Sequence, residues 1–227
     1  MYLTFFKNIS KNTNLFNKMV NLINNMPKLM LLVLGIILSF SILANEKIRC
    51  HYKIVGNNPE SKNIKKIVFE EFINFGCSHC NKLHKASKEF RKNFADQIEF
   101  IDIPILFKGQ DDSPLRLYYV ARKIGKGDLI KDELFNASFI HGVNVFDPGV
   151  TNYLARSLGI SKEFQKEKDL QWVNQLIREG ERKSLIYGVR GTPTVIIQQA
   201  LKMDIGKYGS MDAFLKKFPE TIEDLMR

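Results

Sequence analysis

Two cysteines in this sequence stand three residues apart, in the tetrapeptide Cys77-Ser78-His79-Cys80. A strand-like segment precedes them and a helix-like segment follows, so the pair falls at the start of a helix. A helix N-terminus presents free backbone N–H groups and the positive end of the helix dipole, which stabilise an anion. We therefore predict that Cys77 is an exposed nucleophilic thiol with a lowered pKa. Cys80, one turn further in, would be the resolving thiol of a redox-active Cys77–Cys80 disulfide.

His79 can add positive charge or a hydrogen bond to the Cys77 thiolate, which would stabilise the reduced pair further. A dithiol whose reduced form is stabilised is a strong oxidant of other proteins. The main alternative is half of a zinc site, which would need two further ligands. Cys50, His51 and His84 could be recruited, but the sequence contains no second C-x-x-C and no H-x-x-x-H motif. We therefore favour the redox pair, with no metal and no organic cofactor.

The segments on either side of the cysteines predict a strand–helix–strand unit. Residues 67–75 are nearly continuously apolar and rich in β-branched and aromatic side chains, which is typical of a strand buried on both faces. Gly76 ends this strand. From Cys77 onward the apolar residues recur with helical spacing. Residues 98–103 predict a second strand, which Pro104 ends.

The middle and the end of the chain differ in pattern. Residues 113–187 contain no convincing strand, and glycines divide them into three or four expected helices. A short strand at 194–197, a possible partner strand at 201–205 and a closing helix at 211–218 follow. Gln198 and Gln199 lack the usual hairpin chemistry, so we expect a long or loose turn there.

The element order therefore predicts an α/β fold interrupted by an all-helical insertion. We assign residues 64–108 and 188–227 to a discontinuous α/β domain of the order βαβ … ββα. Residues 109–187 form the helical insertion between its two halves, and residues 45–63 form an N-terminal segment.

The front of the chain has the layout of a targeting segment, which we assign to residues 1–44. The uncharged run at 29–44 has 16 residues, or roughly 24 Å of helix, which is short of the ~30 Å hydrocarbon core. Lys28 precedes this run and small residues lie near its end, so a signal peptide cleaved after Ala44 is expected. An uncleaved membrane anchor is the alternative. Either way, the remainder is exported to a compartment where disulfides persist.

Composition excludes several other classes of protein. The 227 residues are 44% hydrophobic and 26% charged, which argues against disorder. With one long apolar run, the chain is not a multi-span membrane protein. The net charge is +10, and the four lysines ahead of the apolar run leave 30 basic against 24 acidic side chains. Because this modest excess is spread along the chain, we expect no nucleic-acid partner.

The cysteine motif and the later segment Val189-Arg190-Gly191-Thr192-Pro193-Thr194 together resemble the DsbA-like thiol:disulfide oxidoreductases. These are thioredoxin-fold proteins of the bacterial periplasm with a helical insertion. The resemblance covers residues 64–218, and Pro193 stands 113 positions after Cys80 (193 minus 80), which leaves room for that insertion. It implies a thioredoxin fold for the α/β domain.

The resemblance also implies roles for individual residues. Pro193 would be a cis-proline facing the disulfide; taken alone, it would be an ordinary proline at the start of a strand. Thr192 would pair its backbone with a substrate strand, beside Arg190 and Ser78 at the substrate-binding surface. Glu71 would be a buried acid that moves protons to and from Cys80. An edge-strand acid facing solvent is the alternative for Glu71.

By resemblance, the protein is a monomeric periplasmic oxidase that introduces disulfides into unfolded or newly exported cysteine-containing proteins. A quinone-linked membrane protein would reoxidise it. Ser78 stands where the best-known oxidants have proline, and Thr192 does not separate oxidase from isomerase. A disulfide isomerase or reductase of the same fold therefore stays open, as does a metal- or protein-binding module that uses the cysteines as ligands.

Three other residues carry weaker expectations. His84 shares a helical face with the cysteines and could tune them, but we expect a surface histidine. Cys50 is an odd cysteine, either a thiol free for intermolecular pairing or a buried inert one. Trp172 is expected to serve packing.

Overall fold

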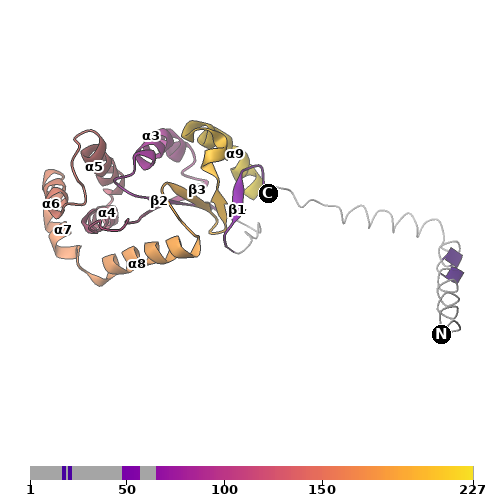
Figure 1. Ribbon diagram of the computed structural model, residues 1–227, viewed down its shortest axis with the longest axis horizontal. Coiled ribbons are helices and arrows are strands. Elements are labelled where there is room, and N and C mark those ends of the chain that lie inside the picture. Colours follow the sequence, from indigo (N-terminus) through magenta and orange to yellow (C-terminus); the bar gives the residue numbers. More distant parts are fainter. Residues whose placement is uncertain (1–16, 19, 22–47, 57–64, 227) are drawn as a thin grey trace. The chain divides into compact units, whose positions relative to one another are not determined.

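The computed structural model describes residues 17–18, 20–21, 48–56 and 65–226 (Figure 1). Residues Met1–Lys47 and Ile48–Arg227 form two compact units. In the first, the four described residues are exposed helical positions, and the rest of the predicted signal or anchor, residues 1–44, lies outside the described residues. In the part of the chain that is described, no helix is long and apolar enough to cross a membrane. Everything below concerns the second unit.

A five-stranded sheet of order β1-β5-β4-β2-β3 forms the centre of this unit. Strand β2 runs parallel to β3 and antiparallel to β4, so the near-continuous apolar segment is a central strand as predicted. The N-terminal segment contributes β1, which pairs with β5 and was not predicted because it is so short. The strands are β1 (Tyr52–Ile54), β2 (Ile67–Ile73), β3 (Ile98–Pro104), β4 (Thr194–Ile197) and β5 (Leu201–Met203).

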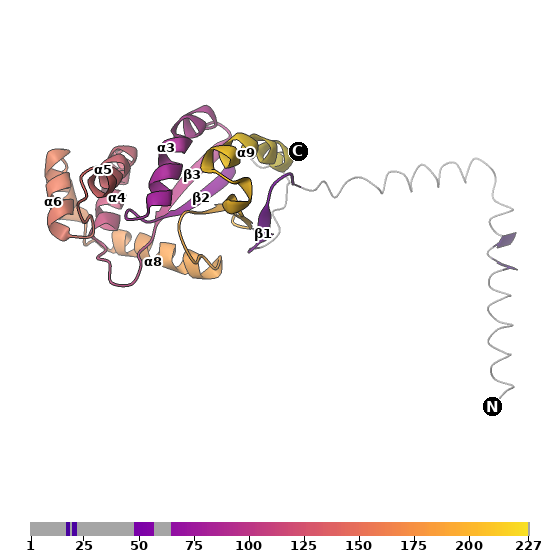
Figure 2. The ribbon, with the colours of Figure 1, turned by 45° about the horizontal axis from the view of Figure 1, so that its top comes forward.

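Helices α3 (Ser78–Asn93) and α9 (Met211–Met226) pack together on one face of the sheet (Figures 1 and 2). An aromatic cluster joins them to β2, with the Phe69 ring centroid 5.4 Å from that of Phe218 and 6.5 Å from that of Phe90. We expected the closing helix to end at Phe218, but it continues through Pro219. Proline in a helix interior is unfavourable by about 3 kcal/mol. Burial of Ile222 and Leu225 beyond it offsets that penalty.

The insertion contains five helices between β3 and β4, against the three or four that we expected. They are α4 (Ser113–Lys123), α5 (Gly127–Phe139), α6 (Pro148–Ser157), α7 (Ser161–Glu167) and α8 (Gln171–Ile186). The first four gather at one end of the sheet, whereas α8 crosses the face opposite α3 and α9 (Figures 1 and 2). A Cβ atom at Gly180 would lie 3.0 Å from Ile103 Cγ2, so glycine permits the close approach of α8 to β3.

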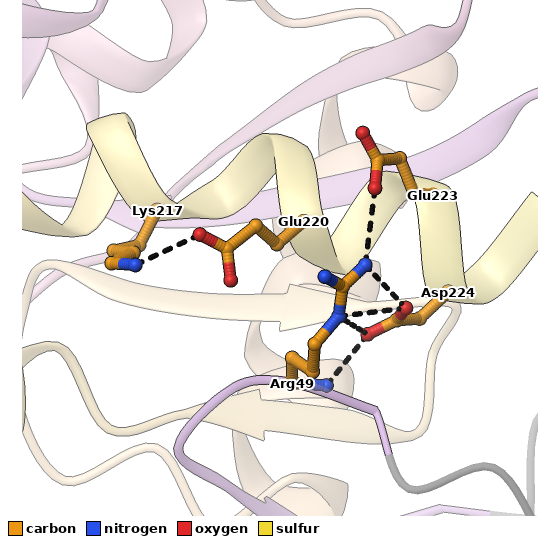
Figure 3. Close-up of polar contacts among 5 residues, drawn as sticks. All are labelled: Arg49, Lys217, Glu220, Glu223 and Asp224. Atoms are coloured by element: carbon orange, nitrogen blue, oxygen red, sulfur yellow. Dashed lines mark hydrogen bonds and ion pairs between the residues drawn. The ribbon is translucent and has the colours of Figure 1, made fainter.

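Arg49 fastens the N-terminal segment to the last helix (Figure 3). Its guanidinium donates to both oxygens of Asp224, with Nη2 at 2.8 Å from Oδ1, and reaches Glu223 Oε2 at 3.0 Å. Its backbone N–H donates to Asp224 Oδ2 at 2.7 Å. Lys217 and Glu220 form a separate ion pair on the same helix. These contacts hold the chain leading into β1 against α9.

The expectation of a loose turn between β4 and β5 is wrong. Gln198 and Gln199 have φ values of 51° and 55°, and Ala200 N donates to Ile197 O at 3.0 Å. Positive φ at both central residues is the geometry of a tight hairpin turn, which normally favours Asn or Gly. Gln198 is held there by two contacts with Val68 of β2: its N–H donates to the Val68 carbonyl, and its Oε1 accepts from the Val68 N–H.

Candidate active site

Cys77 is the N-cap residue of α3, directly after the turn that leaves β2. Its Sγ accepts a hydrogen bond from Cys80 N at 3.3 Å, so a backbone N–H of the first turn points at the sulfur. Cys77 is partly exposed and Cys80 is fully buried, both as free thiols. Ser78 and His79 are exposed. The strand–turn–helix placement predicted from the sequence is confirmed.

The segment around Pro193 lies against this cysteine. The Thr192–Pro193 peptide bond is cis, as the resemblance implied. In its protonated form, Cys77 Sγ donates to Thr192 O at 3.2 Å, a contact that joins positions 115 residues apart. Arg190, in the same segment, is exposed.

The two thiols have opposite proton affinities. The pKa of Cys77 is lowered to about 5, chiefly by a hydrogen bond from the Cys80 thiol. Burial opposes this shift, while the Thr192 side chain and the backbone N–H groups of Cys80 and His79 add to the lowering. Burial raises the pKa of Cys80 far above its ordinary value, and the neighbouring Cys77 sulfur adds to that. Cys77 is therefore a thiolate at neutral pH, while Cys80 keeps its proton. The arrangement supplies one accessible nucleophile and one buried thiol that can resolve a bond made to it.

Asn74 organises the turn that presents Cys77, a role that the sequence analysis missed. Its amide is buried, with Nδ2 donating to Ile105 O at 2.8 Å and to Gln110 Oε1 at 2.7 Å. Its Oδ1 accepts from Gly76 N at 3.0 Å, and its carbonyl accepts from Cys77 N at 2.9 Å. An amide at the end of a buried strand was a usable signal, because a buried polar group needs partners. Nothing local in the sequence pointed to Gln110.

The helical insertion also reaches the active-site turn. A Cβ atom at Gly76 would lie 3.0 Å from Phe146 Cε2, so glycine lets this ring approach the turn. Phe146 and Cys77 both pack against the core cluster that contains Cys80. The sequence pattern predicted only that Gly76 ends the strand.

Glu71 is buried in the central strand, and the alternative of an edge-strand acid facing solvent is wrong. Its carboxylate pairs with Arg91 on α3. The Arg91 guanidinium also binds Asp102 of β3 at 2.6 Å, and Asp102 lies 2.9 Å from Lys131 of α5. Two cations and two carboxylates thus neutralise one another in the interior, as buried charges must.

The expectation of a surface histidine at position 84 is wrong. His84 is 6% exposed, its Nε2 pairs with Asp132 of α5, and its ring centroid lies 5.3 Å from that of Phe135. Helical spacing placed His84 on the cysteine face, but only the packing of α5 on that face buries it.

Cys50 is half-buried, and burial raises its pKa to about 11. Trp172 packs against the core of the insertion, as expected.

A zinc site at the cysteine pair would need further metal ligands close to Cys77 and Cys80. Within residues 48–56 and 65–226, no group of three or more His, Cys, Asp or Glu side chains is placed to hold a metal ion. In that part of the chain, the cysteine pair therefore has no third ligand beside it.

Comparison with known proteins identifies the family. A family model for the DSBA-like thioredoxin domain matches residues 99–217, just over half of the chain, and this segment includes the insertion and Pro193. A thiol:disulfide interchange protein DsbA from Burkholderia cepacia is 23% identical over 168 residues, which cover 74% of this chain and 76% of the relative. The DsbA of Pseudomonas syringae pv. tomato is 23% identical over 159 residues, covering 70% and 74%.

Solved structures agree with the fold. A variant of Pseudomonas aeruginosa DsbA superposes with a TM-score of 0.67 at 17% identity, covering 79% of this chain and 98% of that one. A Proteus mirabilis DsbA, solved with a non-covalently bound peptide, superposes with a TM-score of 0.63 at 18% identity, covering 81% and 100%. The α/β fold with its helical insertion is thus a thioredoxin fold, and the chain belongs to the family of DSBA-like thioredoxin domains, which are thiol:disulfide oxidoreductases.

Proposed function

We propose that this protein is a periplasmic oxidase that introduces disulfides into newly exported proteins through Cys77 and Cys80. The observation that carries the proposal is the lowered pKa of Cys77 at the N-cap of α3, next to a resolving thiol whose pKa is raised. A stabilised Cys77 thiolate favours the dithiol form, so the disulfide form is a good electron acceptor.

The exchange takes two steps. A substrate thiolate attacks the Cys77 sulfur of the Cys77–Cys80 disulfide, a mixed disulfide forms, and Cys80 leaves and takes up a proton. A second thiolate of the substrate then attacks the substrate sulfur of that bond. The substrate disulfide forms, and Cys77 leaves as a stable thiolate. Two electrons pass from the substrate dithiol to the enzyme.

We propose that the substrate binds as an extended segment beside the cis-proline. The Thr192 carbonyl lies 3.2 Å from Cys77 Sγ, so a peptide paired with the Thr192 backbone would have its cysteine next to the nucleophile. The exposed side chains of Ser78, His79 and Arg190 would flank that peptide. The Proteus mirabilis relative was solved with a non-covalently bound peptide, which supports a peptide substrate for this fold.

Export and reoxidation complete the proposal. Residues 1–44 would direct the chain to the periplasm, where a quinone-linked membrane protein would accept its two electrons, and the enzyme would act as a monomer without a cofactor. The fully buried Cys80 is protected from unrelated thiols until a partner has formed a mixed disulfide with Cys77.

The test is the redox equilibrium of the Cys77–Cys80 pair with glutathione. It is measured in a Cys50→Ala background, so that Cys77 and Cys80 are the only thiols that react. The reduction potential of DsbA is about −120 mV, and that of thioredoxin is about −270 mV. We expect a potential closer to the DsbA value. A potential near that of thioredoxin would overturn the oxidase proposal in favour of a reductase.

A further inference from the structure

The function proposed above for the Cys77–Cys80 pair requires Cys80 to exchange a proton with another group. It must gain a proton when a substrate displaces it from the disulfide, and lose one when it attacks a mixed disulfide at Cys77. Its side chain is 0% exposed, so bulk water does not reach the sulfur directly. Another group must carry the proton.

His84 lies one helical turn beyond Cys80 on the same face of α3. Residues at i and i+4 of a helix have Cβ atoms about 5–6 Å apart. The His84 ring packs at a tilt against Phe135, and the Phe135 centroid lies 5.6 Å from that of Phe75. Both phenylalanines belong to the core cluster that also contains Cys80.

The hydrogen bonds of His84 leave one ring nitrogen available. Nε2 pairs with Asp132, which fixes the neutral ring as the tautomer that donates from Nε2. Nδ1 then carries a lone pair, and it is buried with no hydrogen-bond partner among the described residues. His84 thus has an unpaired, buried acceptor one helical turn from the Cys80 thiol.

His84 also has a route to solvent that Cys80 lacks. A cavity of about 620 Å³ lies between α3, β3, α4 and α5, and His84 and Asp132 are part of its wall. Lys88, at its rim, is mostly exposed. A proton on the His84–Asp132 pair can therefore leave through this cavity, away from the surface that Cys77 shares with Thr192.

Glu71, the acid to which the family resemblance assigned this role, is held elsewhere. Its carboxylate pairs with Arg91, which stands eleven residues beyond Cys80 on the same helix (91 minus 80). At 1.5 Å per residue, that is about 16 Å along the helix axis. The ion pair engages only Oε2 of Glu71, and Oε1 is buried without a hydrogen-bond partner among the described residues, so Glu71 is the competing candidate that the experiment below must separate from His84.

We propose that His84 is the proton-transfer group of Cys80. When Cys80 attacks a mixed disulfide, its sulfur bonds to Cys77 Sγ, the partner sulfur leaves as a thiolate, and the thiol proton passes to Nδ1. The resulting imidazolium is paired with the Asp132 carboxylate and releases its proton to the cavity. In the oxidising direction the imidazolium returns the proton to the departing Cys80 thiolate.

The surroundings set the pH at which His84 can act as a base. Burial and the positive charge of Lys131 lower the pKa of His84 below its ordinary 6.5; Asp132 opposes this, and Lys88 adds to the lowering. The neutral ring is therefore the resting form at pH 7. The other charged groups that line the same cavity are Arg91, Lys92, Arg122, Asp102 and Asp128.

The experiment isolates the step in which Cys80 attacks. Reduced protein with the Cys50→Ala change is mixed with saturating oxidised glutathione, quenched in acid at set times, and analysed by mass spectrometry. Glutathionylated protein reports formation of the mixed disulfide at Cys77, and its decay reports ring closure by Cys80. We expect wild-type closure to reach a plateau above the pKa of His84.

In His84→Phe, which keeps an aromatic ring against Phe135, we expect closure at pH 7 to slow tenfold or more. Closure should then rise about tenfold per pH unit with no plateau, because hydroxide must replace the base. Glutathionylation of Cys77 should change less than twofold. The matched control is His141→Phe, at an exposed histidine in the turn after α5, and it should match wild type.

A second variant separates chemistry from packing. In His84→Ala, added imidazole can enter through the cavity and should restore closure in proportion to its free-base concentration, whereas a purely structural defect would not respond. Unchanged closure and pH profile in His84→Phe would overturn the inference, as would a loss in Glu71→Gln but not in His84→Phe. A reducing glutathione equilibrium would overturn the oxidase proposal but leave this rate test intact.

Discussion

The pH dependence of stability should differ between the reduced and oxidised forms, because only the reduced form has a Cys77 thiolate. The pKa of Cys77 is about 5 in the folded chain against an ordinary 9.0. Since the folded pKa is depressed, the thiolate's stabilisation is fully present above pH 9 and is lost as the pH falls through 5. Each pH unit between these values is worth at most about 1.4 kcal/mol. Because Cys77 is partly exposed, solvent screening reduces this to roughly 0.7 kcal/mol.

The disulfide itself acts in the opposite direction. Closing a loop of about four residues removes unfolded-state entropy worth roughly 2 kcal/mol. The oxidised form should therefore be the more stable one near pH 5. The two contributions balance at about pH 6.5 without screening and at about pH 8 with it. Above the crossing, the reduced protein should melt at the higher temperature.

The assay is thermal or urea unfolding of both forms from pH 5 to 9, with Cys50→Ala to keep a single disulfide. We expect the stability of the reduced form relative to the oxidised form to increase across this range. Reduced Cys77→Ser, which lacks the thiolate, should not show the increase. A gap between the two forms that stays constant with pH would refute the assignment of a stabilised thiolate to Cys77.

Three further predictions concern the cysteine site. In Cys80→Ser, mixed disulfides with exported proteins should accumulate as reducible high-mass bands on a gel, whereas Cys77→Ser should trap few; both variants need a Cys50→Ala background, and equal trapping would reverse the assigned roles. His79→Ala should make the pair less oxidising by tens of millivolts, where about 30 mV corresponds to 1.4 kcal/mol; an unchanged glutathione equilibrium would leave the helix terminus as the source of the effect. Asn74→Ala removes two donated hydrogen bonds and takes away the Asn74 donor of the buried Ile105 carbonyl, whereas Gln110 Oε1 still accepts from Phe107 N, so urea unfolding should show a loss of about 1–3 kcal/mol; a loss below about 0.5 kcal/mol would show that the turn is stable without the Asn74 side chain.

The nucleophile and the order of helices and strands could be predicted from the sequence, because both depend on interactions between neighbouring residues. A continuous apolar strand, a glycine and an amphipathic helix place Cys77 at a helix N-terminus wherever the rest of the chain goes, because these elements depend on neighbouring residues. The buried position of Cys80 follows from the same helical period. The element count in the insertion was less predictable, since short helices such as α7 depend on the core that they cover.

Tertiary structure decided which distant groups surround the sulfurs. The hydrogen bond between Cys77 and Thr192 and the amide pair of Asn74 and Gln110 join segments whose separation in sequence carries no signal of contact. His84 shows the same limit: its helical face was predictable, but its burial depended on α5 packing there and offering Asp132. Whether a polar side chain faces water or a partner is set by the element that covers it, and for Asn74 and His84 that element comes from the insertion.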